Sequence, residues 1–222
     1  YDRQARGGMG IFDLDTPEND PPAFLTIADV SQTLVLVTSL ARAFPLPMSQ
    51  LAEAPVRSRG QSLAQWVPFQ PGERLALAFP DLGAGYLAMV TARGQVRRLR
   101  YHYFGANLKP GTLLYEVREG GAPAAVCWTP GDAELFITTR KGMAIRFVET
   151  QIPVRGCLGM RVDPDDGVVG VASVRADSGV FLHGADGKGT IRAMAGFSAN
   201  KEPGSGGKVA MKIRAYDKYG LM

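Results

Sequence analysis

Leu34-Val-Leu-Val-Thr38-Ser-Leu-Ala41 is the first of four similar segments in this 222-residue chain. In each segment a short apolar run leads into a two-residue turn that ends on Gly or Ala. The other three are Leu87-Ala-Met-Val-Thr91-Ala-Arg-Gly94, Leu135-Phe-Ile-Thr-Thr139-Arg-Lys-Gly142 and Val180-Phe-Leu-His-Gly184-Ala-Asp-Gly187. Their starts are 53, 48 and 45 residues apart. An apolar run bounded by Gly is typical of a buried strand that enters a tight hairpin.

Two further motifs repeat with the same period. Five glycines that open another strand are 52, 51, 48 and 48 residues apart: Gly8, Gly60, Gly111, Gly159 and Gly207. Polar turns precede apolar strands at 71–74, 120–123 and 164–167. A period near 50 residues holds about four strands, which is the size of one propeller-type blade.

The pattern predicts an all-β fold. The chain contains 27 Gly and 15 Pro, and no stretch keeps a helical apolar period over three turns. We expect a single domain over residues 1–222 with about five blades and incomplete ends. The predicted repeats span 1–26 (partial), 27–80, 81–130, 131–175 and 176–222 (partial). Because the chain begins at Tyr1, without an initiator Met or a signal peptide, we expect it to be a piece of a longer protein.

Composition excludes several classes of protein. No apolar run reaches the roughly 18 to 20 residues of a membrane helix, so no membrane partner is expected. The two cysteines, Cys127 and Cys157, cannot build a disulfide scaffold or a structural zinc site, and they fit a reducing cytoplasm. The chain has only two histidines, His102 and His183, so it has few residues for a metal site or a His-based catalytic triad. The acidic turn at 163–166 is one of the repeated polar turns, so no catalytic residue and no metal ligand is predicted.

Positive charge is concentrated in the later part of the chain. The net charge is +4, but residues 1–86 carry 6 basic and 9 acidic side chains, whereas residues 87–222 carry 19 and 12. Basic residues recur in each repeat, near the hairpin turn or the strand-opening Gly. The candidate DNA contacts among them are Arg57, Arg59, Arg97, Arg98, Arg100, Lys109, Arg140, Lys141, Arg146, Arg155, Arg192, Lys201 and Lys208. A periodic cationic track fits duplex DNA, since phosphate contacts release counterions and offset the roughly 1–6 kcal/mol that bending costs.

The N-terminal sequence adds a Gly-rich motif, Gln4-Ala-Arg6-Gly7-Gly8-Met-Gly10, preceded by Arg3. Glycines let backbone N–H groups approach a phosphate, and Arg adds a bidentate charge. The motif resembles the Gln-Arg-Arg-Gly-Gly-Lys-Gly box of the C-terminal domain of the DNA gyrase A subunit. Five of seven positions match, and Ala5 and Met9 each replace a basic residue. The predicted DNA contacts in this motif are Arg3, Gln4, Arg6, Gly7, Gly8 and Gly10.

The resemblance extends over nearly the whole chain. Five further segments are similar to the family in the same order: 70–74, 141–147, 155–162, 164–170 and 206–213. The resemblance implies a β-pinwheel, a propeller-like disc whose blades exchange strands, with DNA bent around its rim and fastened by the box. The implied function is DNA wrapping in support of ATP-dependent negative supercoiling by the holoenzyme.

The resemblance also implies partners and a location. They are the rest of the gyrase A subunit and the gyrase B subunit in an A2B2 complex, in the bacterial cytoplasm at the nucleoid. No cofactor is implied for this domain, since ATP and Mg²⁺ act elsewhere in the holoenzyme, and no catalytic activity is expected of it alone. The alternatives are the C-terminal domain of the topoisomerase IV A subunit, which captures DNA segments, and a protein-interaction propeller. A propeller enzyme is disfavoured by the scarcity of His, Cys and clustered carboxylates.

Most aromatic residues lie in or beside apolar strands and are predicted to be core, among them Phe44, Trp128, Phe136 and Phe181. The segment 101–104, Tyr-His-Tyr-Phe, follows three arginines and is the one candidate for a base-stacking platform. Core or edge packing is the favoured interpretation of that segment.

Overall fold

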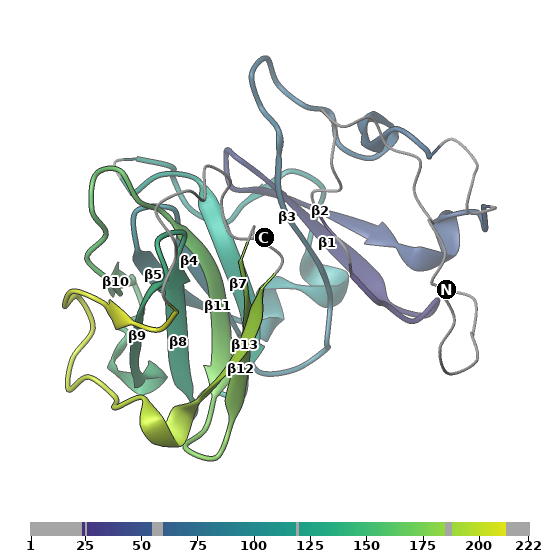
Figure 1. The fold of residues 1–222 in the computed structure, drawn as a ribbon. Helices are drawn as coiled ribbons and strands as arrows, with labels where there is room; N and C mark the ends of the chain where they lie inside the picture. The colour runs from purple at the N-terminus through teal and green to yellow at the C-terminus, as the bar shows by residue number, and fades with distance from the viewer. Residues whose placement is uncertain (1–23, 25, 55–59, 119, 185–187, 212–222) are drawn as a thin grey trace, which may run out of the picture.

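The computed structural model describes residues 24, 26–54, 60–118, 120–184 and 188–211 (Figure 1). Within these residues the chain forms strands and short 3-10 turns and has no α-helix, which confirms the all-β prediction. The strands are β1 (Thr33–Thr38), β2 (Arg42–Pro47), β3 (Leu75–Pro80), β4 (Tyr86–Thr91), β5 (Gln95–Arg100), β6 (Thr112–Leu113), β7 (Pro123–Thr129), β8 (Glu134–Thr139), β9 (Met143–Val148), β10 (Cys157–Leu158), β11 (Val168–Val174), β12 (Gly179–His183), β13 (Gly189–Ala193) and β14 (Lys208–Val209). The 3-10 turns are η1 (Met48–Gln50), η2 (Leu63–Gln65), η3 (Tyr101–Tyr103), η4 (Gly105–Asn107), η5 (Glu149–Gln151) and η6 (Met194–Gly196).

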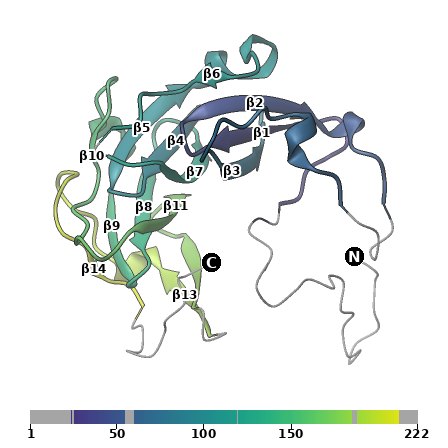
Figure 2. The same ribbon diagram turned by 90° about the horizontal axis from the view of Figure 1, so that it is seen from above.

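The strands form three four-stranded antiparallel sheets and, in the described residues, a fourth sheet of two strands. The strand orders are β3-β1-β2-β6, β10-β5-β4-β7, β11-β8-β9-β14 and β12-β13. Each of the three larger sheets contains one hairpin, a third strand beside the first strand of that hairpin, and a very short strand beside the second. The sheets follow one another along an arc (Figure 2). The third strands β3, β7 and β11 lie on the inner side of this arc, and the short strands β6, β10 and β14 lie on its outer side.

The short outer strands are exchanged between neighbouring sheets. β6 follows the hairpin of the second sheet but pairs with β2 of the first, with Leu113 opposite Arg42. In the same way β10 pairs with β5, and β14 pairs with β9. Each sheet therefore takes its outer strand from the next repeat, which confirms the strand exchange implied by the family resemblance.

The hairpin turns explain why Gly recurs with the repeat. The last turn residue has a positive φ in all three larger sheets: Ala41 (58°), Gly94 (85°) and Gly142 (77°). This left-handed conformation favours Gly because other residues bring Cβ too close to the backbone. At Gly94 a Cβ would also lie 2.1 Å from the carbonyl oxygen of Met160, just beyond the exchanged strand β10. In the second sheet, Gly thus stands where the exchanged segment passes close to the turn.

The hydrophobic cores lie between successive sheets. Trp128 of β7 packs on Phe79 of β3 and on Phe104, with ring centroids 6.2 and 5.3 Å apart, and joins the first two sheets. Phe136 of β8 packs edge-on against Phe197, which follows the fourth sheet, at 5.2 Å. Because both faces of the middle sheets are covered, their strands do not show the alternating burial of a half-exposed sheet.

The prediction of a core position for Phe181 was wrong. Phe181 of β12 is 64% exposed, and its cross-strand partner Ile191 is 72% exposed. Phe136 at the matching position of β8 is 1% exposed because the fourth sheet covers it. The corresponding face of the fourth sheet is not covered by any described residue.

Candidate nucleic-acid interface

The structure divides the predicted DNA contacts by exposure. Eight of them lie outside the described residues: Arg3, Gln4, Arg6, Gly7, Gly8, Gly10, Arg57 and Arg59. Seven are exposed: Arg100, Lys109, Arg140, Lys141, Arg155, Lys201 and Lys208. Three are half-buried, Arg97, Arg98 and Arg192, and Arg146 is buried. Exposed side chains can reach a partner, whereas buried ones are already committed to the fold.

The exposed residues include a group at the outer strands. Lys109 opens the turn into β6, because Thr112 donates its N–H to the Lys109 carbonyl at 3.0 Å. Arg155 lies two residues before β10, in a turn closed by Gly156 N–H on the Pro153 carbonyl at 2.8 Å. Lys208 is the first residue of β14, and Lys201 lies in the loop before that strand. Three consecutive sheets therefore carry an exposed cation within three residues of the start of the exchanged strand, on the outer side of the arc.

Arg140 and Lys141 are exposed at the β8–β9 turn, but both face the acidic turn at 163–166. Lys141 forms an ion pair with Asp165, and Arg140 donates to the Asp165 carbonyl at 3.3 Å. The hydrogen bond from Lys141 lowers the pKa of Asp165 and raises the pKa of Lys141 in return. The local positive charge of this turn is partly compensated by that carboxylate.

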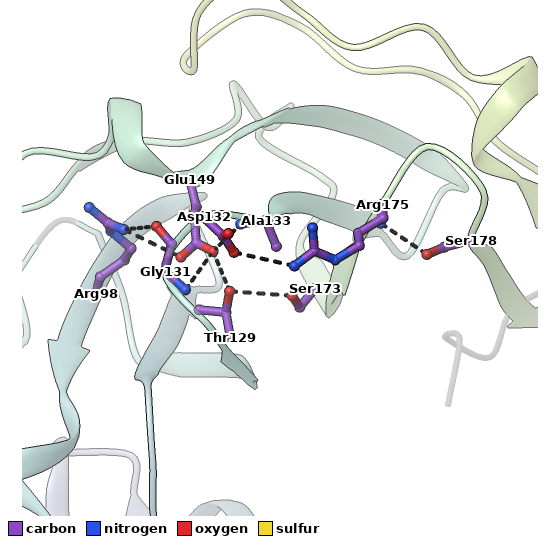
Figure 3. Close-up of polar contacts among 9 residues, drawn as sticks. All are labelled: Arg98, Thr129, Gly131, Asp132, Ala133, Glu149, Ser173, Arg175 and Ser178. Atoms are coloured by element: carbon purple, nitrogen blue, oxygen red, sulfur yellow. Dashed lines mark hydrogen bonds and ion pairs between the residues drawn. The ribbon is translucent and has the colours of Figure 1, made fainter.

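Arg98 is held in a polar network between the second and third sheets (Figure 3). Its guanidinium lies over the Tyr86 ring at 5.1 Å and donates to the Gly131 carbonyl at 3.2 Å. It also pairs with Glu149 at 3.4 Å, and the Glu149 side chain is fully buried.

Glu149 is the centre of this network. It accepts hydrogen bonds from the Thr129 hydroxyl and from the backbone N–H groups of Gly131 (3.1 Å) and Ala133 (2.8 Å). A buried carboxylate is tolerated only when it is paired and hydrogen-bonded, and here both conditions hold. Arg98 and Glu149 therefore fasten β5 and η5 to the loop at 131–133.

Arg146 has the corresponding structural role between the third and fourth sheets. It is 6% exposed, and its Nε donates to Glu134 at 2.8 Å. Its Nη1 donates to the carbonyls of Met194 at 2.6 Å and Phe197 at 2.9 Å. The register of the hairpins places Arg146 in β9 where Arg98 stands in β5, since each is opposite the third residue of the preceding strand.

The remaining two arginines lie against aromatic rings. The Arg97 guanidinium is 4.8 Å from the centre of the Tyr115 ring, and the Arg192 guanidinium is 5.5 Å from the centre of the Phe197 ring. Such contacts hold the cation while leaving part of it accessible. Arg97 lines a polar groove with Arg118 and Glu116, and Arg192 has a buried Nε without a hydrogen bond to any described atom.

Two of the arginines outside the predicted set, Arg161 and Arg93, have a clear place in the structure. Arg161 is exposed and follows β10 by three residues, so it belongs with the outer-strand cations. The signal was present, because Arg161 and Arg155 both lie in the segment 155–162 that resembles the family. Arg93 has a structural role, since its guanidinium donates to the carbonyls of Val162, Asp163 and Asp166, each at 3.0 Å.

The described part of the chain offers neither a metal site nor a membrane-spanning helix. Among the residues that the structure describes, no group of three or more His, Cys, Asp or Glu side chains is placed to hold a metal ion. None of the helical turns that it describes has the length and apolarity of a membrane-spanning helix. The structural feature that stands out is the row of cations along the outer strands.

Comparison with known proteins found DNA gyrase A subunits among the relatives of this chain. No family model matches the chain. The DNA gyrase A subunit of Mycolicibacterium smegmatis is 26% identical over 230 residues, which covers 98% of this chain and 27% of that protein. The DNA gyrase A subunit of Escherichia coli is 25% identical over 230 residues, covering 100% of this chain and 26% of that protein. The chain thus spans about a quarter of the length of these curated relatives.

Solved structures share its fold. The DNA gyrase A C-terminal domain matches with a TM-score of 0.71 and 16% identity over 87% of this chain and 65% of that chain. The C-terminal domain of DNA topoisomerase IV matches with a TM-score of 0.67 and 21% identity over 86% of this chain and 62% of that chain. The E. coli ParC C-terminal domain matches with a TM-score of 0.63 and 16% identity over 93% of this chain and 88% of that chain. Sequence and fold together confirm the resemblance: the chain is similar to DNA gyrase A subunits over nearly its whole length and has the β-pinwheel fold of the gyrase A and topoisomerase IV C-terminal domains.

Proposed function

We propose that this chain binds double-stranded DNA along the outer side of its arc of sheets and bends the duplex around it. The observation that carries the proposal is the recurrence of an exposed cation beside each exchanged strand: Lys109 at β6, Arg155 at β10 and Lys208 at β14. A row of cations on a convex edge neutralises phosphates along a curved path, and each contact contributes by releasing counterions. Bent DNA needs many such contacts because bending costs on the order of 1–6 kcal/mol.

The track that we propose is smaller than the set predicted from sequence. It consists of exposed residues on or near the outer strands: Arg100, Lys109, Arg155, Arg161, Lys201 and Lys208. Arg98 and Arg146 are left out because Arg98 is half-buried and Arg146 is buried, and their guanidinium groups are bonded within the protein. The Gly-rich motif at 4–10 keeps the sequence period, since Gly8 lies 52 residues before Gly60, and on this ground we propose that it belongs to the same track. The prediction that each of these glycines opens a strand was wrong for Gly60, which precedes η2, and for Gly159, which follows β10.

In the whole enzyme, this chain would act as the DNA-wrapping part of the gyrase A subunit and support ATP-dependent negative supercoiling. Its partners would then be the rest of the gyrase A subunit and the gyrase B subunit in an A2B2 complex in the bacterial cytoplasm, at the nucleoid. The relatives that are DNA gyrase A subunits support this assignment. Catalysis, ATP and Mg²⁺ are assigned to other parts of that enzyme, so the isolated chain is expected to bind DNA without cleaving it.

Salt-titrated binding to a duplex tests the track. We expect the logarithm of the binding constant to fall linearly with the logarithm of the salt concentration. Lys109→Ala and Arg155→Ala should each make this slope shallower by about 0.9, the value of one phosphate contact. Arg118→Ala is the matched control, because Arg118 is 77% exposed in its side chain but is ion-paired with Glu116. If the control changes affinity and slope as much as Arg155→Ala does, the chain responds to net charge alone and the track is refuted.

A topological assay separates wrapping from simple binding. Relaxed circles ligated in the presence of the chain should trap writhe of one sign. An unchanged linking number at saturating protein would contradict wrapping. It would favour the topoisomerase IV alternative, in which the domain captures a DNA segment. That alternative is supported by Ala5 and Met9, which replace two basic residues of the gyrase box.

A further inference from the structure

The Tyr-His-Tyr-Phe segment at 101–104 divides into two inward and two outward rings. Tyr101 and Phe104 pack against Trp128, with ring centroids 5.9 and 5.3 Å away, and Phe104 is 1% exposed. His102 is exposed and Tyr103 is 51% exposed. The prediction of core or edge packing therefore holds for two of the four residues, and the other two face solvent.

The two outward rings form a platform. His102 and Tyr103 lie with ring centroids 4.1 Å apart and planes inclined by 34°. Their backbone is fixed on both sides, because Asn107 Nδ2 donates to the His102 carbonyl at 2.8 Å and Phe104 N–H donates to the Tyr101 carbonyl at 2.7 Å. An exposed aromatic pair on a fixed backbone can stack on a planar ligand at little entropic cost.

The platform borders a groove of about 500 Å³ on the outer side of the arc. Apolar side chains also line the groove, including Leu113 of β6, which is 54% exposed, and Val154, which is 95% exposed. Arg100 lies in the lining and is exposed, and none of the described lining residues is Asp or Glu. The groove therefore combines stacking surface, apolar walls and uncompensated positive charge.

We propose that this groove binds unpaired bases of single-stranded DNA, with His102 and Tyr103 stacking on the base and Arg100 contacting the adjacent phosphate. A paired duplex buries its base faces and would leave Tyr103, Leu113 and Val154 in water. An unpaired base covers such surfaces, and base–aromatic stacking tolerates any sequence because every base has a π-face. Arg155 directly follows the lining residue Val154, and Lys109 precedes the lining residue Thr112 by three positions, so a single strand would leave the groove onto the proposed cationic track. The site goes beyond duplex bending and does not depend on it.

Binding of the 222-residue chain to a 12-nucleotide oligo-dT and to a 12-base-pair duplex at the same salt concentration tests the proposal. Tyr103→Ala and His102→Ala should each weaken oligo-dT binding about 5- to 100-fold and leave duplex binding within twofold of wild type. Tyr103→Phe keeps the ring and should retain the affinity for oligo-dT. Phe181→Ala is the matched control, an exposed aromatic residue (64%) in the fourth sheet, and should change neither affinity. Equal unfolding midpoints would show that the variants keep the fold.

Three results would overturn the proposal. Oligo-dT binding by Tyr103→Ala equal to wild type would remove the platform from the site. Equal losses for oligo-dT and duplex would place Tyr103 on the duplex track. If polyglutamate displaced oligo-dT as effectively as a second oligonucleotide does, that result would show that the groove recognises negative charge and not bases. Absence of duplex binding by the wild type would refute the proposed function alone, since the loss of oligo-dT affinity would still identify the groove.

Discussion

Gly94→Ala tests the idea that the hairpin glycines exist to admit the exchanged strand. Gly94 has a φ of +85°, and a Cβ there would lie 2.1 Å from the Met160 carbonyl oxygen. The Gly94 carbonyl accepts hydrogen bonds from Gly159 N–H at 2.8 Å and Met160 N–H at 3.2 Å. The exchanged segment would have to move away from the turn and lose both bonds.

The magnitude follows from two contributions. A left-handed Ala costs about 1–2 kcal/mol, of which about 0.4–1 kcal/mol is offset by the lower entropy of the unfolded chain. The two hydrogen bonds contribute about 1 kcal/mol each. We therefore expect Gly94→Ala to lower the free energy of unfolding by about 2–4 kcal/mol.

Gly72→Ala is the matched control. Gly72 also has a positive φ, +77°, but a Cβ there would meet no atom within 4 Å. It should lose about 1 kcal/mol, from the backbone conformation alone. Urea unfolding followed by the fluorescence of Trp66 and Trp128 measures both variants. Equal losses of stability for Gly94→Ala and Gly72→Ala would refute the clash with the exchanged segment as the reason for the glycine.

Three further outcomes are expected. Arg146→Gln should lower the free energy of unfolding by about 3–5 kcal/mol, because it leaves Glu134 and two carbonyls without their charged partner. In a binding titration, the folded variant should keep its affinity for duplex DNA within twofold of wild type. Hydrogen bonding to Arg42 lowers the pKa of Glu73 to about 2. The contribution of Glu73 to stability is therefore complete above about pH 4.5 and is lost as the pH falls toward 2. Urea midpoints measured in this pH range should decline less steeply for Glu73→Gln than for the wild type. Burial raises the pKa of Cys127 to about 12, so Ellman's reagent should modify the less buried Cys157 first at pH 8, and Cys157→Ser should abolish the faster phase.

The repeated strands were predictable from sequence because their signal is local. Each hairpin is marked by a run of apolar residues and a turn that needs a positive φ, as at Gly94 and Gly142, and three motifs share one period. The antiparallel pairing within each hairpin follows from such turns. The pairing of β6 with β2 could not be predicted in this way, because a two-residue strand has no periodicity. The expectation of strand exchange came from the family resemblance.

The orientation of the arginines was not predictable in the same way. Alternation along a strand shows which face is polar only when one face meets solvent. β9 is covered on both sides, and Arg146 lies among the buried residues Ala144, Ile145 and Phe147. The sequence around Arg146 therefore does not show which groups accept its hydrogen bonds. Its acceptors, the carbonyls of Met194 and Phe197, lie about 50 residues away in the sequence. For Phe181 the missing information was whether another sheet covers it.

The exchange of outer strands has a consequence for how such an array can be cut, shortened or extended. No boundary between two repeats leaves both sides whole, because removing a repeat also strips β6, β10 or β14 from the sheet before it and bares the edge of β2, β5 or β9. Truncation from the C-terminal side should therefore damage the preceding blade together with the one deleted. If blades are gained or lost during evolution, the chain has to be joined within equivalent hairpins. Each added repeat then supplies the short outer strand that pairs with the sheet before it.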